Sequence, residues 1–285
     1  MMYKKFLLII LILFLFLLCN LAFKFNESFD VKEKIVVCFF GVIPRSIKYT
    51  WNTIKENIID PLKGKYDVDI YVFNMNVEDI KVDDVKLNQE DINIIPYTYK
   101  EEELQTKVDE EIDSLCKNIK CKIGTFPRYN NNVIKNSIRQ MYSEYRTGLF
   151  LEKNMNKYKK AIVCGSDYFL VNKINLNDFL NSDDSSVYTS DINDWGGVTN
   201  GFYFGKCLAL TPILKRYEQL HKYLPSNENY EYILKQSIID NNINRKITNM
   251  SFFKIRANKK IHTLRKNLGN KKMYEFVSNK LKAIK

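Results

Sequence analysis

One acidic residue, Asp167, stands just past a short apolar run and is the first candidate for chemistry. The run 161–164 (AIVC) has the character of a buried strand, and Gly165 and Ser166 separate it from Asp167. Ligands of open α/β sheets gather outside the carboxyl ends of the strands, so this carboxylate is placed to hold a divalent metal on a phosphate-bearing substrate. A turn-forming or helix-capping aspartate is the alternative interpretation.

A glycine-rich segment, 191–205, holds further candidates. Within these fifteen positions, Asp191, Asp194 and Trp195 stand beside four glycines. Because glycine lets the backbone approach a ligand closely, we interpret the segment as a substrate loop that returns into a strand. A surface hairpin is the alternative, although it would leave Trp195 poorly used on a solvated turn.

Strand and helix patterns alternate from residue 34 onward and must position these side chains. The apolar run 34–40 predicts a strand buried on both faces of a sheet, and apolar spacing predicts a helix at 47–59 that stops at Pro61. Further strands are predicted at 66–73, 92–97, 161–164 and 187–189, further helices at 100–120, 132–154 and 176–180, and an acidic loop at 77–90. The alternation predicts one α/β domain with a mostly parallel, Rossmann-type sheet flanked by helices.

Two arginines, Arg139 and Arg146, project from the predicted helix 132–154. The apolar and aromatic residues of this helix recur at three- and four-residue spacings, which indicates a core-facing stripe. Either arginine can reach a phosphate in the crevice, and a solvated position is the alternative.

The cysteines indicate neither a disulfide scaffold nor a zinc site. Cys38 and Cys164 lie in apolar strand runs, so we predict that both are buried on adjacent or nearby strands. Cys116 and Cys121 can close a small loop if the domain faces an oxidising lumen, and otherwise stay reduced. No CxxC pair occurs and the chain has two histidines, which favours a hard, oxygen-ligated metal.

The first 23 residues predict a membrane anchor. Residues 6–18 carry no polar side chain, and the whole apolar stretch is near the lower length for a membrane span. An uncleaved signal anchor is favoured over a cleaved signal peptide, because 20–22 (NLA) matches the small-x-small cleavage pattern poorly. Lys4 and Lys5 precede the span, which predicts a single-pass protein with a cytoplasmic N-terminus, a short stem at 24–33 and a luminal or exoplasmic remainder.

The net charge of +11 is concentrated near the C-terminus. Residues 251–285 hold eleven Lys and Arg against Glu275 alone, so the rest of the chain is almost neutral. This distribution argues against a nucleic-acid partner. The basic helical tail predicted at 259–285 either contacts anionic headgroups or is a solvated helix.

Several short segments, taken in order, resemble one family. They are 38–41 (CFFG), 44–46 (PRS), Ser166 with Asp167, 196–205, 229–234 (NYEYIL) and 253–258 (FKIRAN). Their order and spacing over residues 34 to 260 resemble the GT-A-type glycosyltransferases of large DNA viruses, algae and bacteria, which are similar to nucleotide-diphospho-sugar transferases. The resemblance implies a GT-A-like domain at 34–258, behind the anchor.

The resemblance also implies a donor site for a nucleotide-diphospho-sugar. Gly41 and Arg45 are expected near the diphosphate, and Asp167 is expected to hold a divalent metal, Mn²⁺ or Mg²⁺, on it. Gly196 and Gly197 are expected to shape the sugar pocket.

Two positions depart from the family pattern. The family usually has an arginine before the metal-binding aspartate, where this chain has Gly165 and Ser166, and an aspartate after the two glycines, where this chain has Thr199 and Asn200. We place Ser166 and Asn200 in the donor site. Because the missing arginine removes a charge that can pair with phosphate, the alternative function is a catalytically impaired binding or structural protein tethered to a membrane.

The expected reaction is transfer of the sugar to an acceptor hydroxyl of a glycan, protein or lipid. The diphosphate leaves while an acceptor hydroxyl loses its proton, so the site needs a neutralising group and a base. Asp191, Asp194 and Glu231 are the candidate bases. Dinucleotide oxidoreductases and P-loop enzymes are disfavoured, because no GxGxxG follows Phe40 and no GK[ST] loop occurs.

Overall fold

The computed structural model describes residues 15–16, 32–77, 81–118, 131–192, 194–224, 229–262 and 271–284, with the backbone alone at 131–133. Contacts divide the chain into Met1–Glu33 and Lys34–Lys285, and the second unit is described below. The predicted anchor and most of the stem lie outside the described residues. Within the described part of the chain, no helix is both long and apolar enough to cross a membrane.

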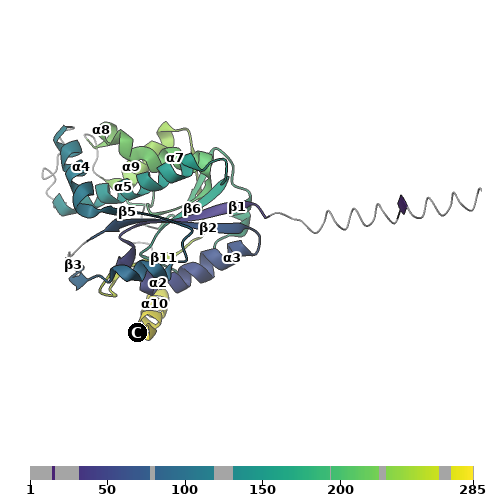
Figure 1. The fold of residues 1–285 in the computed structure, drawn as a ribbon, viewed down its shortest axis with the longest axis horizontal. Coiled ribbons are helices and arrows are strands. Elements are labelled where there is room, and N and C mark those ends of the chain that lie inside the picture. The colour runs from purple at the N-terminus through teal and green to yellow at the C-terminus, as the bar shows by residue number, and fades with distance from the viewer. Residues whose placement is uncertain are drawn as a thin grey trace, which may run out of the picture. The chain divides into compact units, whose positions relative to one another are not determined.

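A seven-stranded sheet forms the centre of this unit, in the order β10-β8-β9-β6-β1-β2-β5 (Figure 1). The strands are β1 (Lys34–Gly41), β2 (Asp67–Asn76), β5 (Tyr99–Leu104), β6 (Lys160–Gly165), β8 (Ser186–Thr189), β9 (Phe202–Lys206) and β10 (Asn244–Ile247). Neighbouring strands are parallel except at β9, which runs antiparallel to both β6 and β8. The prediction of an α/β domain with a mostly parallel sheet is therefore confirmed.

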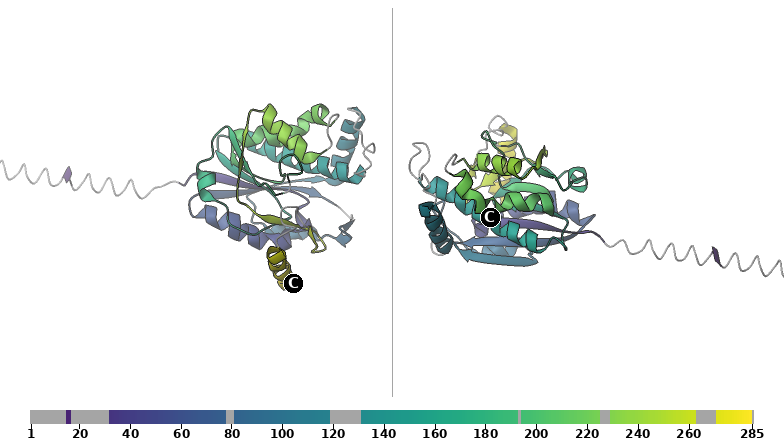
Figure 2. Two further views of the ribbon diagram at one scale, coloured as in Figure 1. Left: turned by 180° about the vertical axis from the view of Figure 1, so that it is seen from behind. Right: turned by 90° about the horizontal axis from the view of Figure 1, so that it is seen from above.

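Helices cover both faces of the sheet, as the front and rear views show (Figures 1 and 2). One face carries α4 (Gln105–Asn118), α5 (Asn131–Lys153), α7 (Cys207–Leu214), η4 (Lys215–Gln219), α8 (Leu220–Tyr223) and α9 (Tyr230–Asp240). The other carries η1 (Ile43–Arg45), α2 (Ile47–Ile54), the π-helical η2 (Lys55–Ile59), α3 (Asp60–Lys63) and α6 (Leu176–Leu180). The structure is thus a three-layer α/β/α arrangement.

Strand β1 explains why two separate cores form. Its side chains alternate between the faces, as a strand requires. Val36, Cys38 and Phe40 pack under the α5 layer, while Ile35, Val37 and Phe39 pack under α2. Phe39 pairs with Cys164 on β6, so the two buried cysteines lie on adjacent strands, as predicted.

The helix predicted at 47–59 continues past Pro61 to Lys63, so the predicted stop was wrong. A proline lacks the N–H that would bond to the carbonyl four residues earlier, here Asn57. The π-helical turn lies just before the proline, and the Asn57 carbonyl instead accepts from the backbone N–H of Ile174 (2.9 Å). Because the Asn57 carbonyl has this donor from outside the helix, the helix can continue through Pro61.

The strand predicted at 92–97 and the start of the helix predicted at 100–120 were also wrong. Residues Gln89–Ile94 form the 3-10 helix η3, and the third parallel strand is β5, at the charged run Tyr99–Leu104. A lysine followed by three glutamates favours a helix locally, but pairing with β2 prevails, and Arg146 binds Glu101 and Glu103. Charged residues are common on such edge strands. The predicted acidic loop contains a short hairpin, β3 (Lys81–Val82) and β4 (Val85–Lys86).

A second, three-stranded antiparallel sheet lies beside the α2 layer. It consists of β7 (Tyr168–Leu170), β11 (Phe252–Ile255) and β12 (Ile261–His262), with β11 in the middle. The basic helix α10 (Lys271–Ala283) buries Val277 and Leu281 in the same cluster as Phe253. Residues of the basic tail therefore belong to the same compact unit as the main sheet.

Candidate functional site

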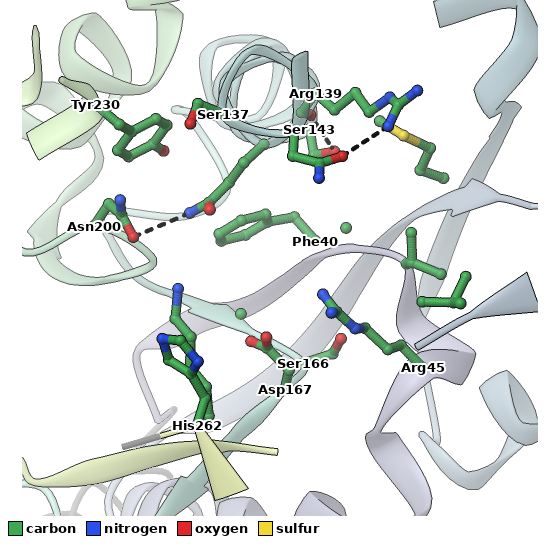
Figure 3. Close-up of a pocket in the computed structure, with 18 of the residues that line it drawn as sticks. Phe40, Arg45, Ser137, Arg139, Ser143, Ser166, Asp167, Asn200, Tyr230 and His262 are labelled. Carbon is green, nitrogen blue, oxygen red and sulfur yellow. Dashed lines mark hydrogen bonds between the residues drawn. The ribbon is translucent and has the colours of Figure 1, made fainter. Parts of the chain in front are cut away.

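A cavity of about 870 Å³ opens at the carboxyl ends of β1 and β6. The chain leaves β1 toward β2 on one side and later adds β6 on the other, which makes this pair the topological switch point of the sheet. Ligands of open α/β folds bind at such points, and the volume is in the usual range for small-molecule sites. Figure 3 shows the cavity between α5 on one side and Asp167 on the other.

The structure brings six of the ten sequence-predicted site residues into the lining of this cavity. They are Gly41, Arg45, Ser166, Asp167, Asn200 and Glu231. The other four, Asp191, Asp194, Gly196 and Gly197, are not among the residues that line it.

Three basic residues of the second sheet also line the cavity, and the sequence analysis did not place them there. Lys254 and Arg256 are two positions apart at the end of β11 and so share one face, while Phe253 and Ile255 point into the core behind. His262 on β12 lies directly opposite Lys254. The alternation F-K-I-R in the sequence was the signal that could have found them.

These three basic side chains face Asp167, the last residue of the loop between β6 and β7. The backbone N–H of Ile255 donates to the Asp167 carbonyl (2.8 Å), which fixes β11 against this loop. The Asp167 carboxylate interacts electrostatically with Arg45, Lys254, Arg256 and His262. It makes no side-chain hydrogen bond or close ion pair with any described residue. One carboxylate therefore stands among several cations.

Burial lowers the pKa of Lys254, and the nearby Arg256 adds to this effect, whereas Asp167 opposes it. The pKa of Arg256 is lowered by burial and then by Arg45. Its Nη2 lies 3.4 Å from Nδ1 of His262. An arginine only donates, so this contact needs a neutral imidazole whose Nδ1 accepts. Burial followed by Arg256 lowers the pKa of His262, which agrees with that state.

Arg45 reaches the cavity from η1 and holds the tip of the β3–β4 hairpin. Its Nε and Nη2 each donate to the Asp83 carboxylate at 2.9 Å. The same carboxylate accepts from the backbone N–H of Ala257 (3.0 Å). Burial raises the pKa of Asp83, but the Arg45 and Ala257 hydrogen bonds outweigh it and leave the pKa lowered. At this corner of the cavity, Arg45 and the Ala257 N–H thus hold the carboxylate of Asp83.

Glu231 enters the cavity from the first turn of α9, which Asn229 caps by accepting from the Tyr232 N–H (2.8 Å). Asn200 donates to Glu231 Oε1 (3.2 Å), and Gln140 of α5 donates to Asn200 (3.3 Å). Burial raises the pKa of Glu231, with a further contribution from Asp194. The carboxylate is thus positioned and poised to accept a proton.

The chain of contacts behind Glu231 ends in a fully buried ion pair. Gln140 also donates to Glu144, which pairs with Arg216 (2.6 Å), and neither charged side chain is exposed. The Tyr203 hydroxyl donates to Glu144 (3.2 Å) and accepts from the backbone N–H of Gly201 (2.8 Å). The wall that carries Asn200 is therefore fixed from the core.

Two of the residues that do not line the cavity, Asp194 and Gly197, hold the glycine-rich loop in place. Asp194 forms a two-pronged ion pair with Arg245 (2.8 and 2.9 Å) and accepts from Thr199. Burial raises the pKa of Asp194, but the Arg245 and Thr199 contacts leave it lowered, which disfavours a role as base. Gly197 packs against the α9 backbone, where a Cβ would lie 2.1 Å from the Glu231 carbonyl.

The two helix arginines have separate outcomes. Arg139 lines the cavity, with its guanidinium paired to Asp109 (2.6 Å). Arg146 is not part of the lining and binds the β5 glutamates instead. Cys121 lies outside the described residues, so its pairing with Cys116 stays a prediction.

A divalent metal, expected from the position of Asp167 and from the resemblance, finds an incomplete set of ligands among the described residues of this cavity. The described residues contain no group of three or more His, Cys, Asp or Glu side chains that could hold a metal ion. Asp167 stands among cations, Asp83 is held by Arg45, and Glu231 is held by Asn200. Nearby cations repel a divalent ion. The set fits an anion better than a metal, and the metal stays a prediction from the resemblance.

The chain matches none of the protein-family models and none of the curated proteins with which it was compared. Its function must therefore be argued from the cavity.

Proposed function

We propose that this protein is a membrane-anchored glycosyltransferase with a GT-A-like domain, which transfers a sugar from a nucleotide-diphospho-sugar to an acceptor hydroxyl. The observation that supports it most is the excess of positive charge in the switch-point cavity. Five lining residues are lysines or arginines, Arg45, Lys81, Arg139, Lys254 and Arg256, against three acidic residues, Asp83, Asp167 and Glu231. A phosphate-bearing donor is the ligand class that suits both this charge and this position.

The chemistry assigns separate tasks to the two walls of the cavity. The bond from the anomeric carbon to the diphosphate breaks, and the cations beside Asp167 neutralise the leaving group. The acceptor oxygen bonds to the same carbon and passes its proton to Glu231. Of the three candidate bases, Glu231 is the one that lines the cavity, and burial raises its pKa. The acceptor, whether glycan, protein or lipid, would approach along the α9 side.

The test is release of nucleoside diphosphate from a panel of nucleotide-sugars by the full chain in detergent, with and without Mn²⁺. We expect release with at least one donor, and a loss of about 100-fold or more in Glu231→Gln with donor binding kept. The matched control is Glu56→Gln, an exposed glutamate of the π-helical turn. A Glu231→Gln variant with full activity would remove Glu231 from the mechanism.

The second candidate is a binding or structural protein that kept the fold without the chemistry. The absence of an arginine at Gly165 and Ser166, on the loop that leads to Asp167, favours it. Saturable binding of a nucleotide-sugar without any release or transfer, across the whole donor and acceptor panel, would establish this alternative.

A further inference from the structure

We propose that Lys254, Arg256 and Arg45 bind the diphosphate of the donor directly, so that donor binding needs no divalent metal. This inference rests on the proposed function, because it names the groups that neutralise the leaving diphosphate of that reaction. It differs from the metal-assisted reaction that the resemblance implies.

The first support is the pair of basic residues Lys254, on β11, and Arg256, directly after it. Lys254 and Arg256 are half-buried and line the cavity, and neither forms an ion pair within 4.0 Å among the described residues. The Lys254 ammonium lies over the Tyr168 ring, 5.2 Å from its centroid. Withdrawing an unpaired cation from water is costly, so two of them side by side indicate a site that is completed by an anion.

The second support is the corner formed by Arg45. Its guanidinium and the Ala257 N–H already hold one carboxylate, that of Asp83, with three hydrogen bonds. Arg45 Nη1 donates to no described residue, which leaves it for a ligand. Arg45 interacts electrostatically with Arg256 and Asp167, so this donor belongs to the same charged group. A hydrogen bond from a charged guanidinium to a phosphate oxygen is charge-assisted and stronger than one between neutral groups.

The effect of Asp167 on the affinity for the diphosphate distinguishes direct binding from binding through a metal. If a metal links the protein to the diphosphate, the carboxylate attracts the complex and its loss abolishes binding. If Lys254, Arg256 and Arg45 bind the diphosphate directly, the Asp167 carboxylate repels the ligand and competes with it for these cations. Asp167→Asn therefore weakens binding in the first case and leaves it equal or stronger in the second.

The experiment uses the full chain in detergent and isothermal titration calorimetry. The probes are UDP, GDP, ADP, CDP and inorganic pyrophosphate, each titrated in EDTA and in Mn²⁺. We expect at least one nucleoside diphosphate to bind in EDTA with an affinity within about 3-fold of that in Mn²⁺. If pyrophosphate also binds in EDTA, the diphosphate alone is recognised. If pyrophosphate does not bind while a nucleoside diphosphate does, the nucleoside contributes part of the affinity. Both results support direct binding.

Three variants extend the test. Lys254→Met and Arg256→Gln should each weaken metal-free binding about 10- to 100-fold, the usual effect of losing a charge-assisted hydrogen bond. Asp167→Asn should not weaken it. The matched control is Lys222→Met, because Lys222 pairs with Asp240 and does not line the cavity. Melting curves without ligand show whether each variant is folded, and the wild-type comparison in EDTA needs no variant.

The outcomes separate this inference from the proposed function. Binding that requires Mn²⁺ and disappears in Asp167→Asn would overturn the inference and leave the proposed function standing. Failure of every diphosphate to bind under both conditions would overturn both.

Discussion

The Glu231 carboxylate is the base in the proposed reaction, and its surroundings predict how the transfer rate depends on pH. Burial and Asp194 raise its pKa, while a backbone hydrogen bond and Lys254 lower it, and the net direction is upward. A base must be deprotonated, so we expect the transfer rate to fall as pH decreases through a midpoint above the ordinary glutamate value of about 4.3. The pH–rate profile of sugar transfer measures this midpoint.

The same shift predicts the effect of Glu231 on stability. Between the ordinary pKa and the raised one, the folded protein binds more protons at Glu231 than the unfolded chain does. The contribution of Glu231 to the free energy of unfolding therefore decreases as pH rises through this window. Glu231→Gln should remove this pH dependence of the free energy of unfolding in denaturant titrations. In the pH–rate profile, a midpoint at or below the ordinary glutamate pKa would contradict the assignment of Glu231 as the base.

The sequence was informative about single residues where position alone defines the chemistry. Asp167 follows a fully apolar strand, and such a carboxylate could be placed at the sheet edge without knowing its neighbours. Lys254 could not be placed in this way, because its role depends on β11 pairing with β7, more than eighty residues earlier in the chain. The ion pair of Asp194 could not be predicted for the same reason, since its partner Arg245 lies on β10.

At the scale of elements, the loop 194–201 and helix α9 are held together by backbone contacts. The backbone N–H of Val198 donates to the Glu231 carbonyl (2.9 Å), and Gly197 lies against the same peptide. In Gly197→Ala, the new Cβ would meet the Glu231 carbonyl carbon at 2.1 Å and the Tyr232 nitrogen at 2.4 Å. Backbone atoms cannot yield as a flexible side chain does, so α9 or the loop must move.

We therefore expect Gly197→Ala to destabilise the fold by about 1–3 kcal/mol, the usual range for overpacking. Sugar transfer should decrease more than donor binding does, because Glu231 moves with α9. The free energy of unfolding and the transfer rate are the two measurements. Gly64→Ala is the matched control, since its Cβ would meet only Pro61 O at 3.5 Å. A Gly197→Ala variant with wild-type stability and activity would show that the loop and helix are not coupled.

The elements that the sequence predicted well are those whose local pattern and tertiary environment agree. The helix predicted at 132–154 and the strand at 161–164 both match, within one residue, α5 and β6. The strand β5 was not predicted, because its pattern of charges favours a helix and its pairing with β2 is a tertiary effect. β9 runs antiparallel to its neighbours, and in the loop before it Gly201 adopts a positive φ of 83°. Glycine content showed that a turn was there, but not its direction.

At the scale of the whole molecule, the charges around residues 1–23 predict that the domain is luminal or exoplasmic, and the fold provides a reporter for this orientation. The sequence contains two N-glycosylation triplets, at Asn26 and at Asn249. Asn26 lies outside the described residues. Asn249 is exposed, in the loop between β10 and β11, where its side chain is accessible to a glycosyl-transferring enzyme.

When the full chain is translated into sealed microsomes, we expect Asn249 to receive a glycan and a C-terminal tag to be protected from added protease. Asn249→Gln should lose the mobility shift of one glycan and keep the protection, because orientation is set by the lysines before the span and not by this residue. Detergent should make the tag digestible. Digestion of the tag in intact microsomes, with no glycan on Asn249, would place the domain on the cytoplasmic side and exclude luminal acceptors as its substrates.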